Sequence, residues 1–415
     1  SNLHTTLSDE NVVKETWASV RKAVSGITLT AQSEGTSTMS LTATINGVEK
    51  TYQFKINVKP SVWLGGCYYI GNGNKRPAIW RNGKLFKVFE DFTARNDYGY
   101  PYVSKIQFYK DKIYVMLMGP QYVQMDHACI MEGNLFTGNF SVYKDNLSCV
   151  YSLKYGDYHI ADPLLYVSEA GDVYYTDAAR QEPESYSSQI NSSFWRNKEL
   201  IDLEPNRVVK DMVYVDEQGY LVASLLKSDF WAQYDWDDYK SCIVGWSESD
   251  GMRDITTISH SSANYLSYNN HKLVASGRYW YGKFSNYYRH AVWTIANKSY
   301  NTITNNLTYG YERAFSHGDN YATGRILIRA DGSTYDYFSY DNSRIYGVYC
   351  PEYEAHAIST VCGDYGYCLR LTADQRYYTV VVFNLDQPMY QPELITFPKR
   401  DYDEYDILEV QSSIN

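Results

Sequence analysis

The sequence predicts an almost entirely β protein, and three observations lead to this prediction. Aromatic residues are abundant, with 44 Tyr, 14 Phe and 9 Trp among 415 residues, and such side chains fit the pleated, half-buried surface of a sheet. Helical periodicity is nearly absent, the best helix candidate being 11–24. Short apolar runs followed by polar turns recur along the chain instead. We therefore expect many short antiparallel strands.

The segment AIWRNGKL at 78–85 shows this recurring feature most clearly. Asn-Gly between two apolar runs is a strong hairpin signal, because both residues tolerate positive φ and the tight turn matches the twist of the strands. The segment therefore predicts strands at 78–80 and 85–89, joined at Asn82 and Gly83.

Similar segments follow at six later places, and each is preceded by at least one more strand-like run. The later copies are 128–135, 192–200, 241–252, 290–300, 335–345 and 379–387. Four strands in about 50 residues are typical of a β-propeller blade. The repeats predict a propeller over 60–415 with seven blades, and six or eight blades remain alternatives because two copies match poorly. In the sixth unit, 324–330 is expected to be the second strand.

The last strand-like segment of the chain predicts how this ring closes. The first repeat begins directly at its second strand, in KPSVWLGG, and so lacks an inner strand. Residues 405–412 are apolar enough to supply it. Such a strand would remove the exposed edge that an open ring of blades leaves.

Residues 1–59 differ from the repeats and predict a small β-sandwich. Apolar and polar residues alternate there, with turns at Glu34-Gly35 and Asn46-Gly47. The Gly35-Thr36 pair, the run SLTATINGV and the final INV resemble the bacterial group 2 Ig-like domain. The resemblance covers about 45 residues by the reach of those motifs, and it lacks the first strand of that domain, which implies an N-terminally truncated copy.

A second resemblance covers nearly the whole chain. The join INVKPSVWLGG followed by W-x-N-G-type hairpins is similar to exported propeller proteins of Bacteroidetes, many of which are lipoproteins. The resemblance implies export to the periplasm or the outer-membrane surface, with a possible lipid anchor in a missing N-terminal segment. It carries no catalytic residue, because its motifs are structural.

Charge and motifs exclude several classes of function. The net charge of −10 disfavours nucleic acid as a partner, and no apolar run is long enough to predict a transmembrane segment. No nucleotide, metalloprotease or hydrolase motif occurs, so the sequence predicts no cofactor, no metal and no catalytic residue. We expect a monomer in which most of the seven Cys are buried hydrophobes. A pair between Cys362 and Cys368 stays open.

Long loops between second and third strands offer the best functional signal. Two of them, 227–240 and 278–290, belong to consecutive blades and should be neighbours on one face of the ring. Both alternate aromatic residues with charged ones, a pattern suited to stacking on sugar rings and binding their hydroxyls. The predicted ligand-binding residues are Trp231, Tyr234, Trp236, Asp237, Asp238, Tyr279, Trp280, Tyr281, Tyr287 and Arg289.

These loops lead to a functional hypothesis with open alternatives. The leading one is an exported, non-catalytic protein that binds a glycan or another small polar ligand. The alternatives are a glycoside hydrolase or polysaccharide lyase on the same face, and a protein-interaction scaffold. The aromatics may equally pack against one another as a stiff rim, and Asp235, Asp237 and Asp238 leave a Ca²⁺ loop open.

Overall fold

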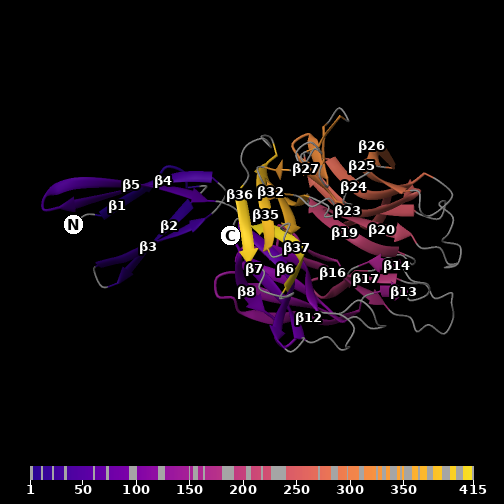
Figure 1. Ribbon diagram of the computed structural model, residues 1–415, viewed down its shortest axis with the longest axis horizontal. Helices are drawn as coiled ribbons and strands as arrows, with labels where there is room; N and C mark the ends of the chain where they lie inside the picture. Colours follow the sequence, from indigo (N-terminus) through magenta and orange to yellow (C-terminus); the bar gives the residue numbers. More distant parts are fainter. Residues whose placement is uncertain are drawn as a thin grey trace. The chain divides into compact units, whose positions relative to one another are not determined.

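A computed structural model represents the protein (Figure 1) and describes 28 stretches of the chain. They are 3–10, 13–20, 23–31, 35–58, 61–71, 74–92, 101–119, 127–148, 150–152, 158–161, 164–179, 191–201, 207–215, 218–225, 240–269, 272–281, 288–296, 298–307, 313–323, 326–329, 333–336, 344–345, 348–349, 358–362, 365–371, 377–385, 393–398 and 405–413. These residues contain strands and turns but no helix, as the sequence predicts. No helix in this part of the chain could cross a bilayer. The chain divides into two compact units, Ser1–Trp63 with Ser412–Asn415, and Leu64–Gln411.

The first unit contains two small antiparallel sheets. One has the order β1-β4-β5, and the other is the hairpin β2-β3. Their strands are β1 Leu3–Leu7, β2 Val13–Val20, β3 Ala23–Ala31, β4 Gly35–Ile45 and β5 Val48–Val58. The helix candidate 11–24 is therefore wrong: its β-branched residues enter a strand, where Trp17 pairs with Ile27.

Few apolar residues are buried in this unit. Its core cluster holds buried Val13 and Val58, with Leu7 and Ile56 packed against them. Tyr52 and Phe54 on β5 remain 48% and 47% exposed. The predicted turn is present, because Asn46 and Gly47 join β4 to β5 with φ of 53° and 77°.

The second unit consists mainly of four-stranded antiparallel sheets. The described residues form seven of them, six in chain order and one that combines the C-terminal strand with β6, β7 and β8. Their strands are β9 Tyr102–Tyr109, β10 Lys112–Met118, β11 His127–Asn134 and β12 Phe140–Ser148; β15 Leu165–Val167, β16 Val173–Ala179, β17 Asn191–Arg196 and β18 Glu199–Ile201; β19 Arg207–Val215, β20 Gln218–Leu225, β21 Lys240–Ser247 and β22 Gly251–Ser259; β23 Ser261–Asn269, β24 Lys272–Trp280, β25 Tyr288–Ala296 and β26 Ser299–Leu307; β27 Ala314–His317, β28 Asn320–Thr323, β29 Ile326–Ile328 and β30 Thr334–Asp336; β33 Ile358–Cys362, β34 Tyr365–Leu371, β35 Tyr377–Asn384 and β36 Glu393–Pro398; and β37 Tyr405–Ser413, β6 Ser61–Gly71, β7 Asn74–Arg81 and β8 Lys84–Val88. Two short hairpins pair β13 Val150–Ser152 with β14 Tyr158–Ala161, and β31 Arg344–Ile345 with β32 Val348–Tyr349.

This strand order is that of a β-propeller. Each meander comes from a continuous stretch of chain, and the first and last stretches share one sheet, because β37 is hydrogen-bonded beside β6. The prediction that the C-terminal strand completes the first repeat is confirmed. The hairpin at 78–85 is confirmed as well, since Arg81 pairs with Lys84 around Asn82 (φ 46°) and Gly83 (φ 82°).

The sixth predicted repeat is placed wrongly along the chain. Its second strand is β28, not 324–330, and residues 326–328 form the third strand, β29. The fourth strand is β30, within the segment expected to hold the third. These strands have only three or four residues each, too few for an alternating pattern to show where they begin.

Tyrosine packs the sheets against one another. Tyr174 and Tyr175, consecutive on β16, belong to two different core clusters. Tyr174 stacks on Phe194 of its own sheet and on Tyr214 of the next, with ring centroids 5.9 and 5.7 Å apart. Tyr175 lies in the cluster that contains β9–β12 residues. Burial raises the pKa of both phenols, that of Tyr175 to about 12.

The described cysteines are isolated thiols. Cys67, Cys129, Cys242 and Cys368 are buried and free. Cys368 pairs across its hairpin with Ile358, whereas Cys362 pairs with Tyr365. A Cys362–Cys368 bridge is therefore wrong, because the strand register places the two residues in different rows.

Candidate functional site

The sheets of the propeller have two chemically different ends. The first and third strands of each meander lead into tight turns at one end, which we call the turn end. The second and third strands are joined at the other, which we call the loop end. Antiparallel pairing fixes this assignment for every four-stranded sheet.

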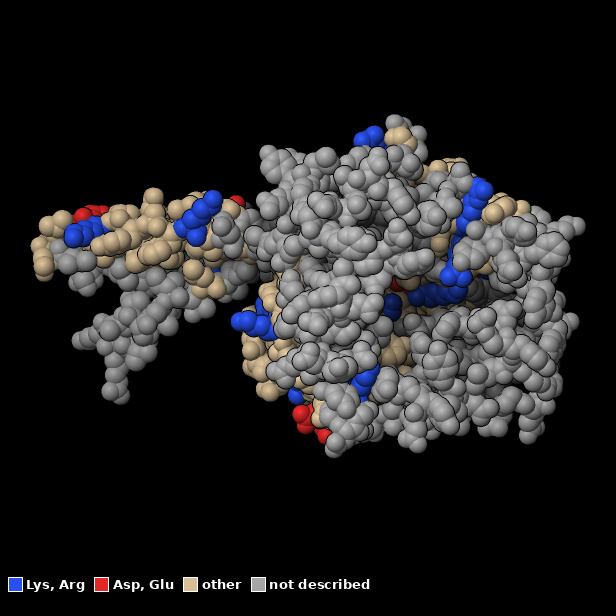
Figure 2. Space-filling model, in the orientation of Figure 1, with Lys and Arg blue, Asp and Glu red and all other residues tan. Residues whose placement is uncertain are grey.

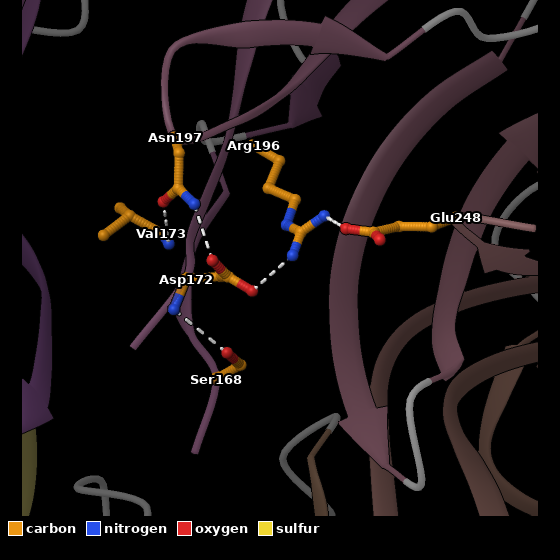
Figure 3. Close-up of polar contacts among 6 residues, drawn as sticks. All are labelled: Ser168, Asp172, Val173, Arg196, Asn197 and Glu248. Carbon is orange, nitrogen blue, oxygen red and sulfur yellow. Dashed lines mark hydrogen bonds and ion pairs between the residues drawn. The ribbon is translucent and has the colours of Figure 1, made fainter. Parts of the chain in front are cut away.

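The turn end is held by a network of side chains (Figure 3). Asp172, in the β15–β16 turn, accepts hydrogen bonds from Arg196 Nη2 at 2.7 Å and from the amide of Asn197 at 2.5 Å. Asn197 Oδ1 in turn accepts the backbone N–H of Val173 at 2.9 Å. Arg196 also pairs with Glu248 in the β21–β22 turn, so one guanidinium joins two successive sheets.

The same bond recurs in the preceding meander. Asn134, beside the β11–β12 turn, donates to the Asp111 carboxylate of the β9–β10 turn at 2.9 Å. Arg196 additionally lies over the Trp246 ring, 5.6 Å from its centroid. The charges at this end are paired within the protein, which indicates a structural role. Sequence reasoning missed this contact, although an Asp after one turn and an Asn at the next was its visible signal.

Towards the loop end, the first strands carry β-bulges. The pairing of first and second strands shifts by one residue at Ser104 on β9, Lys210 on β19, Asn264 on β23 and Ser359 on β33. A bulge re-aims a side chain and bends its strand, and bulges are common beside functional sites. The inserted residue is polar in all four strands.

Two of these bulges are joined across neighbouring sheets. Lys210 Nζ donates to Asn264 Oδ1 at 2.7 Å and to Ser262 Oγ at 2.9 Å, both on β23. The next residue, Asp211, also reaches β23, where its carboxylate accepts the Leu266 N–H at 2.9 Å. The bulge on β19 thus turns a cation and an anion, side by side, towards the first strand of the following sheet.

A second cation approaches β23 from the opposite side. Arg313, just before β27, has its guanidinium 5.6 Å from the Tyr265 ring centroid and 5.3 Å from that of Phe315. We call Lys210, Ser262, Asn264, Tyr265 and Arg313 the β23 bulge site. Figure 2 shows Lys and Arg atoms along the wall of a hollow in the propeller, over the region where Figure 1 labels β19 and β23.

The predicted binding residues are placed only in part. Trp231, Tyr234, Trp236, Asp237, Asp238 and Tyr287 lie outside the described residues. Trp280 is the last residue of β24 rather than a loop tip, and it is only 6% exposed. Its N–H donates to the His260 carbonyl at 2.9 Å. It therefore offers no open stacking face, contrary to expectation.

The remaining predicted residues form a small surface at the loop end. Tyr281 follows β24 and is 49% exposed. Arg289 on β25 places its guanidinium 4.7 Å from the Tyr281 ring centroid. Arg289 pairs across the sheet with half-buried Tyr279, which in turn pairs with Ser261 of β23. One row of the sheet thus connects this surface to the first strand.

The described residues contain no group of three His, Cys, Asp or Glu side chains able to hold a metal ion. The carboxylates that suggested Ca²⁺, Asp235, Asp237 and Asp238, lie outside them. Among the groups that sequence reasoning missed, Lys210 and Asn264 had a visible signal. Each is a polar interruption of a first strand, in VVKDMVYV and SSANYLSY.

No protein-family model matches the chain, and no curated protein matches it. Among solved structures, it resembles Pyrococcus horikoshii acylaminoacyl peptidase at 9% identity and a TM-score of 0.45, over 72% of this chain and 46% of that one. The chain thus spans about half the length of that peptidase. The β-propeller domain of the Trilobed protease from Pyrococcus furiosus matches at 12% identity and a TM-score of 0.36, over 91% and 95%. Synechocystis apocarotenoid oxygenase matches at 10% and 0.44, over 86% and 92%. Likenesses this distant carry no inference about function.

Proposed function

We propose that this chain is an exported, non-catalytic binding protein that recognises a glycan at the loop end of a seven-bladed propeller. The observation that carries the proposal is the surface formed by Tyr281 and Arg289. A half-exposed phenol ring with a guanidinium on one face combines a stacking plane with a hydrogen-bond donor. Sugars present an apolar ring face and hydroxyls to such a pair.

Several finer statements belong to the same proposal. The seven four-stranded sheets of the described residues support seven blades. The alternating strands of residues 1–59 and the resemblance of their motifs support an Ig-like domain, here as a spacer that carries no binding residue. The resemblance to exported propeller proteins of Bacteroidetes supports export and a lipoprotein, with no nucleic-acid partner for a chain of net charge −10.

A glycan array followed by titration tests the proposal. Tyr281→Ala should weaken binding of an array hit by about 1–3 kcal/mol, by analogy with base–aromatic stacking. Phe136→Ala is the matched control, because Phe136 is an aromatic residue that is 70% exposed at the turn end. Equal affinity of Tyr281→Ala and wild type would contradict the proposed surface, and an array with no hit would contradict glycan binding altogether.

Product analysis on each array hit separates binding from catalysis. A hydrolase or lyase would release shorter saccharides over hours, whereas a binding protein leaves the glycan intact. Released product would overturn the non-catalytic part of the proposal and leave the location of the site to the Tyr281→Ala titration.

A further inference from the structure

The β23 bulge site differs in charge from the chain that contains it. The protein carries a net charge of −10, which repels anionic ligands at long range. On β19, β23 and at the start of β27, however, the charged residues are Arg207, Lys210, Asp211 and Arg313. Arg207 pairs with Asp254 at 2.8 Å and is thereby balanced. The two other cations, Lys210 and Arg313, then outnumber the one carboxylate.

The two cations converge on one short segment. Lys210 reaches Asn264 from the preceding sheet, and Arg313 reaches the adjacent Tyr265 from the following one. Both cations are half-buried, so their fields are screened less than those of fully exposed charges. Arg313 also has a buried Nε with no hydrogen-bond partner among the described residues, although a guanidinium presents its N–H groups as a planar fork.

The neutral partners of Lys210 give the site its character. Ser262 and Asn264 orient the ammonium through oxygen atoms that carry no full charge. The single carboxylate on β19, that of Asp211, is directed at the Leu266 backbone N–H. An ammonium fixed by neutral acceptors beside a guanidinium matches a carboxylate ligand, for which charge-assisted hydrogen bonds are the stronger kind.

We propose that the β23 bulge site binds a carboxylate, so that the glycan recognised by this protein is an acidic one, built from uronic-acid or similar sugars. This inference rests on the proposed glycan function and names its ligand class. Tyr281 and Arg289 stack on the sugar ring at the loop end, while Lys210 and Arg313 hold its carboxylate. The polar bulge residue recurs on four first strands because those strands present side chains towards the propeller axis.

The test uses the full chain on an array that carries uronic-acid glycans of several backbones, each beside its carboxyl-reduced counterpart. Wild type should prefer the acidic member of a pair at least tenfold. Lys210→Met and Arg313→Met should each reduce that preference to less than about threefold, whereas Lys210→Arg should retain most of it. Lys112→Met is the matched control, because Lys112 is a cation at the turn end that pairs with Glu132.

A thermal melt of each variant separates binding from a purely structural clamp between β19 and β23. If Lys210→Met melts early, Arg313→Met decides, since Arg313 makes no printed hydrogen bond to β23 and its contact there is with a ring. An unchanged preference in folded Arg313→Met and Lys210→Met overturns the inference.

The two proposals fail in different ways. Equal binding of acidic and carboxyl-reduced glycans overturns the carboxylate site and leaves glycan binding in place. An array with no hit overturns glycan binding. Titration of wild type and Lys210→Met with free glucuronate and with glucose then decides the site alone: a glucuronate-specific thermal shift that Lys210→Met removes supports it, and its absence overturns it.

Discussion

The two ends of the propeller's sheets use similar residues for different purposes. At the turn end, Arg196 is enclosed by Asp172, Glu248 and the Trp246 ring, so its charge joins two sheets. At the loop end, Arg289 lies on the half-exposed ring of Tyr281, and Lys210 is held by two neutral side chains. The comparison teaches that the partner of a cation, more than its burial, separates a structural charge from a binding one.

The largest expected effect comes from removing the strand that spans both ends. Deleting 405–415 takes β37 away from β6 and leaves β6 as an unpaired edge. We expect aggregation or a fall in melting temperature of more than 10 °C, measured by light scattering and circular dichroism. A soluble variant that melts like the full chain would contradict the account of closure.

The next effect separates the two ends directly. Arg196→Met leaves the Asp172 and Glu248 carboxylates without their cation, and should lower the free energy of unfolding by about 1–3 kcal/mol. Arg289→Met is the matched control at the loop end, where the lost contact is with one exposed ring. Chemical denaturation of both variants provides the measurement. Equal losses would mean that the two ends do not differ.

Alkaline pH should destabilise the tyrosine-packed sheets. A buried phenol with a raised pKa contributes stability that is complete below the unfolded value near 10, and that is lost as pH rises towards the folded value. For Tyr175 the folded pKa is about 12, so the loss should run from about pH 10 to 12. Melting curves between pH 9 and 12 show it. Since the Tyr175 hydroxyl is buried without a partner, Tyr175→Phe should delay the loss and cost nothing at pH 7.

The smallest effect concerns one turn. Lys198 has φ of 73°, where a side chain costs about 1 kcal/mol, while Gly83 occupies the matching place in the 78–85 hairpin at φ 82°. Lys198→Gly should stabilise by less than 1 kcal/mol, because it also loses the contact of Lys198 with the Tyr143 ring. Gly83→Ala should destabilise instead. Opposite signs in the two melts would show that the turn end is set by backbone geometry.

The sequence predicted the strands better than the contacts between them. Asn82-Gly83 and the missing inner strand before β6 are local signals, and both gave correct elements. The sixth repeat was placed wrongly because strands of three or four residues leave no period to detect. The segment 11–24 held both β-branched residues and partial helical spacing, and pairing with β3 decided between them.

The candidate site was predictable only at its rim. Tyr281 and Arg289 were found because they alternate in one loop-bearing segment. Trp280 was misjudged because sequence does not show that β24 extends to it. Lys210, Asn264 and Arg313 are 54 residues or less from their neighbours in the chain, yet they meet only through bulges and sheet packing, which no local pattern encodes.

The central claim is that the loop end binds and the turn end supports the fold. The most direct measurement titrates one array glycan against wild type, Tyr281→Ala and Arg196→Met, with a thermal melt of each. The account predicts a crossed result: Tyr281→Ala loses affinity about tenfold at an unchanged melting temperature, whereas Arg196→Met melts earlier and binds normally below its transition. A Tyr281→Ala protein that melts early but binds like wild type, beside an Arg196→Met protein that loses affinity while stable, would contradict it.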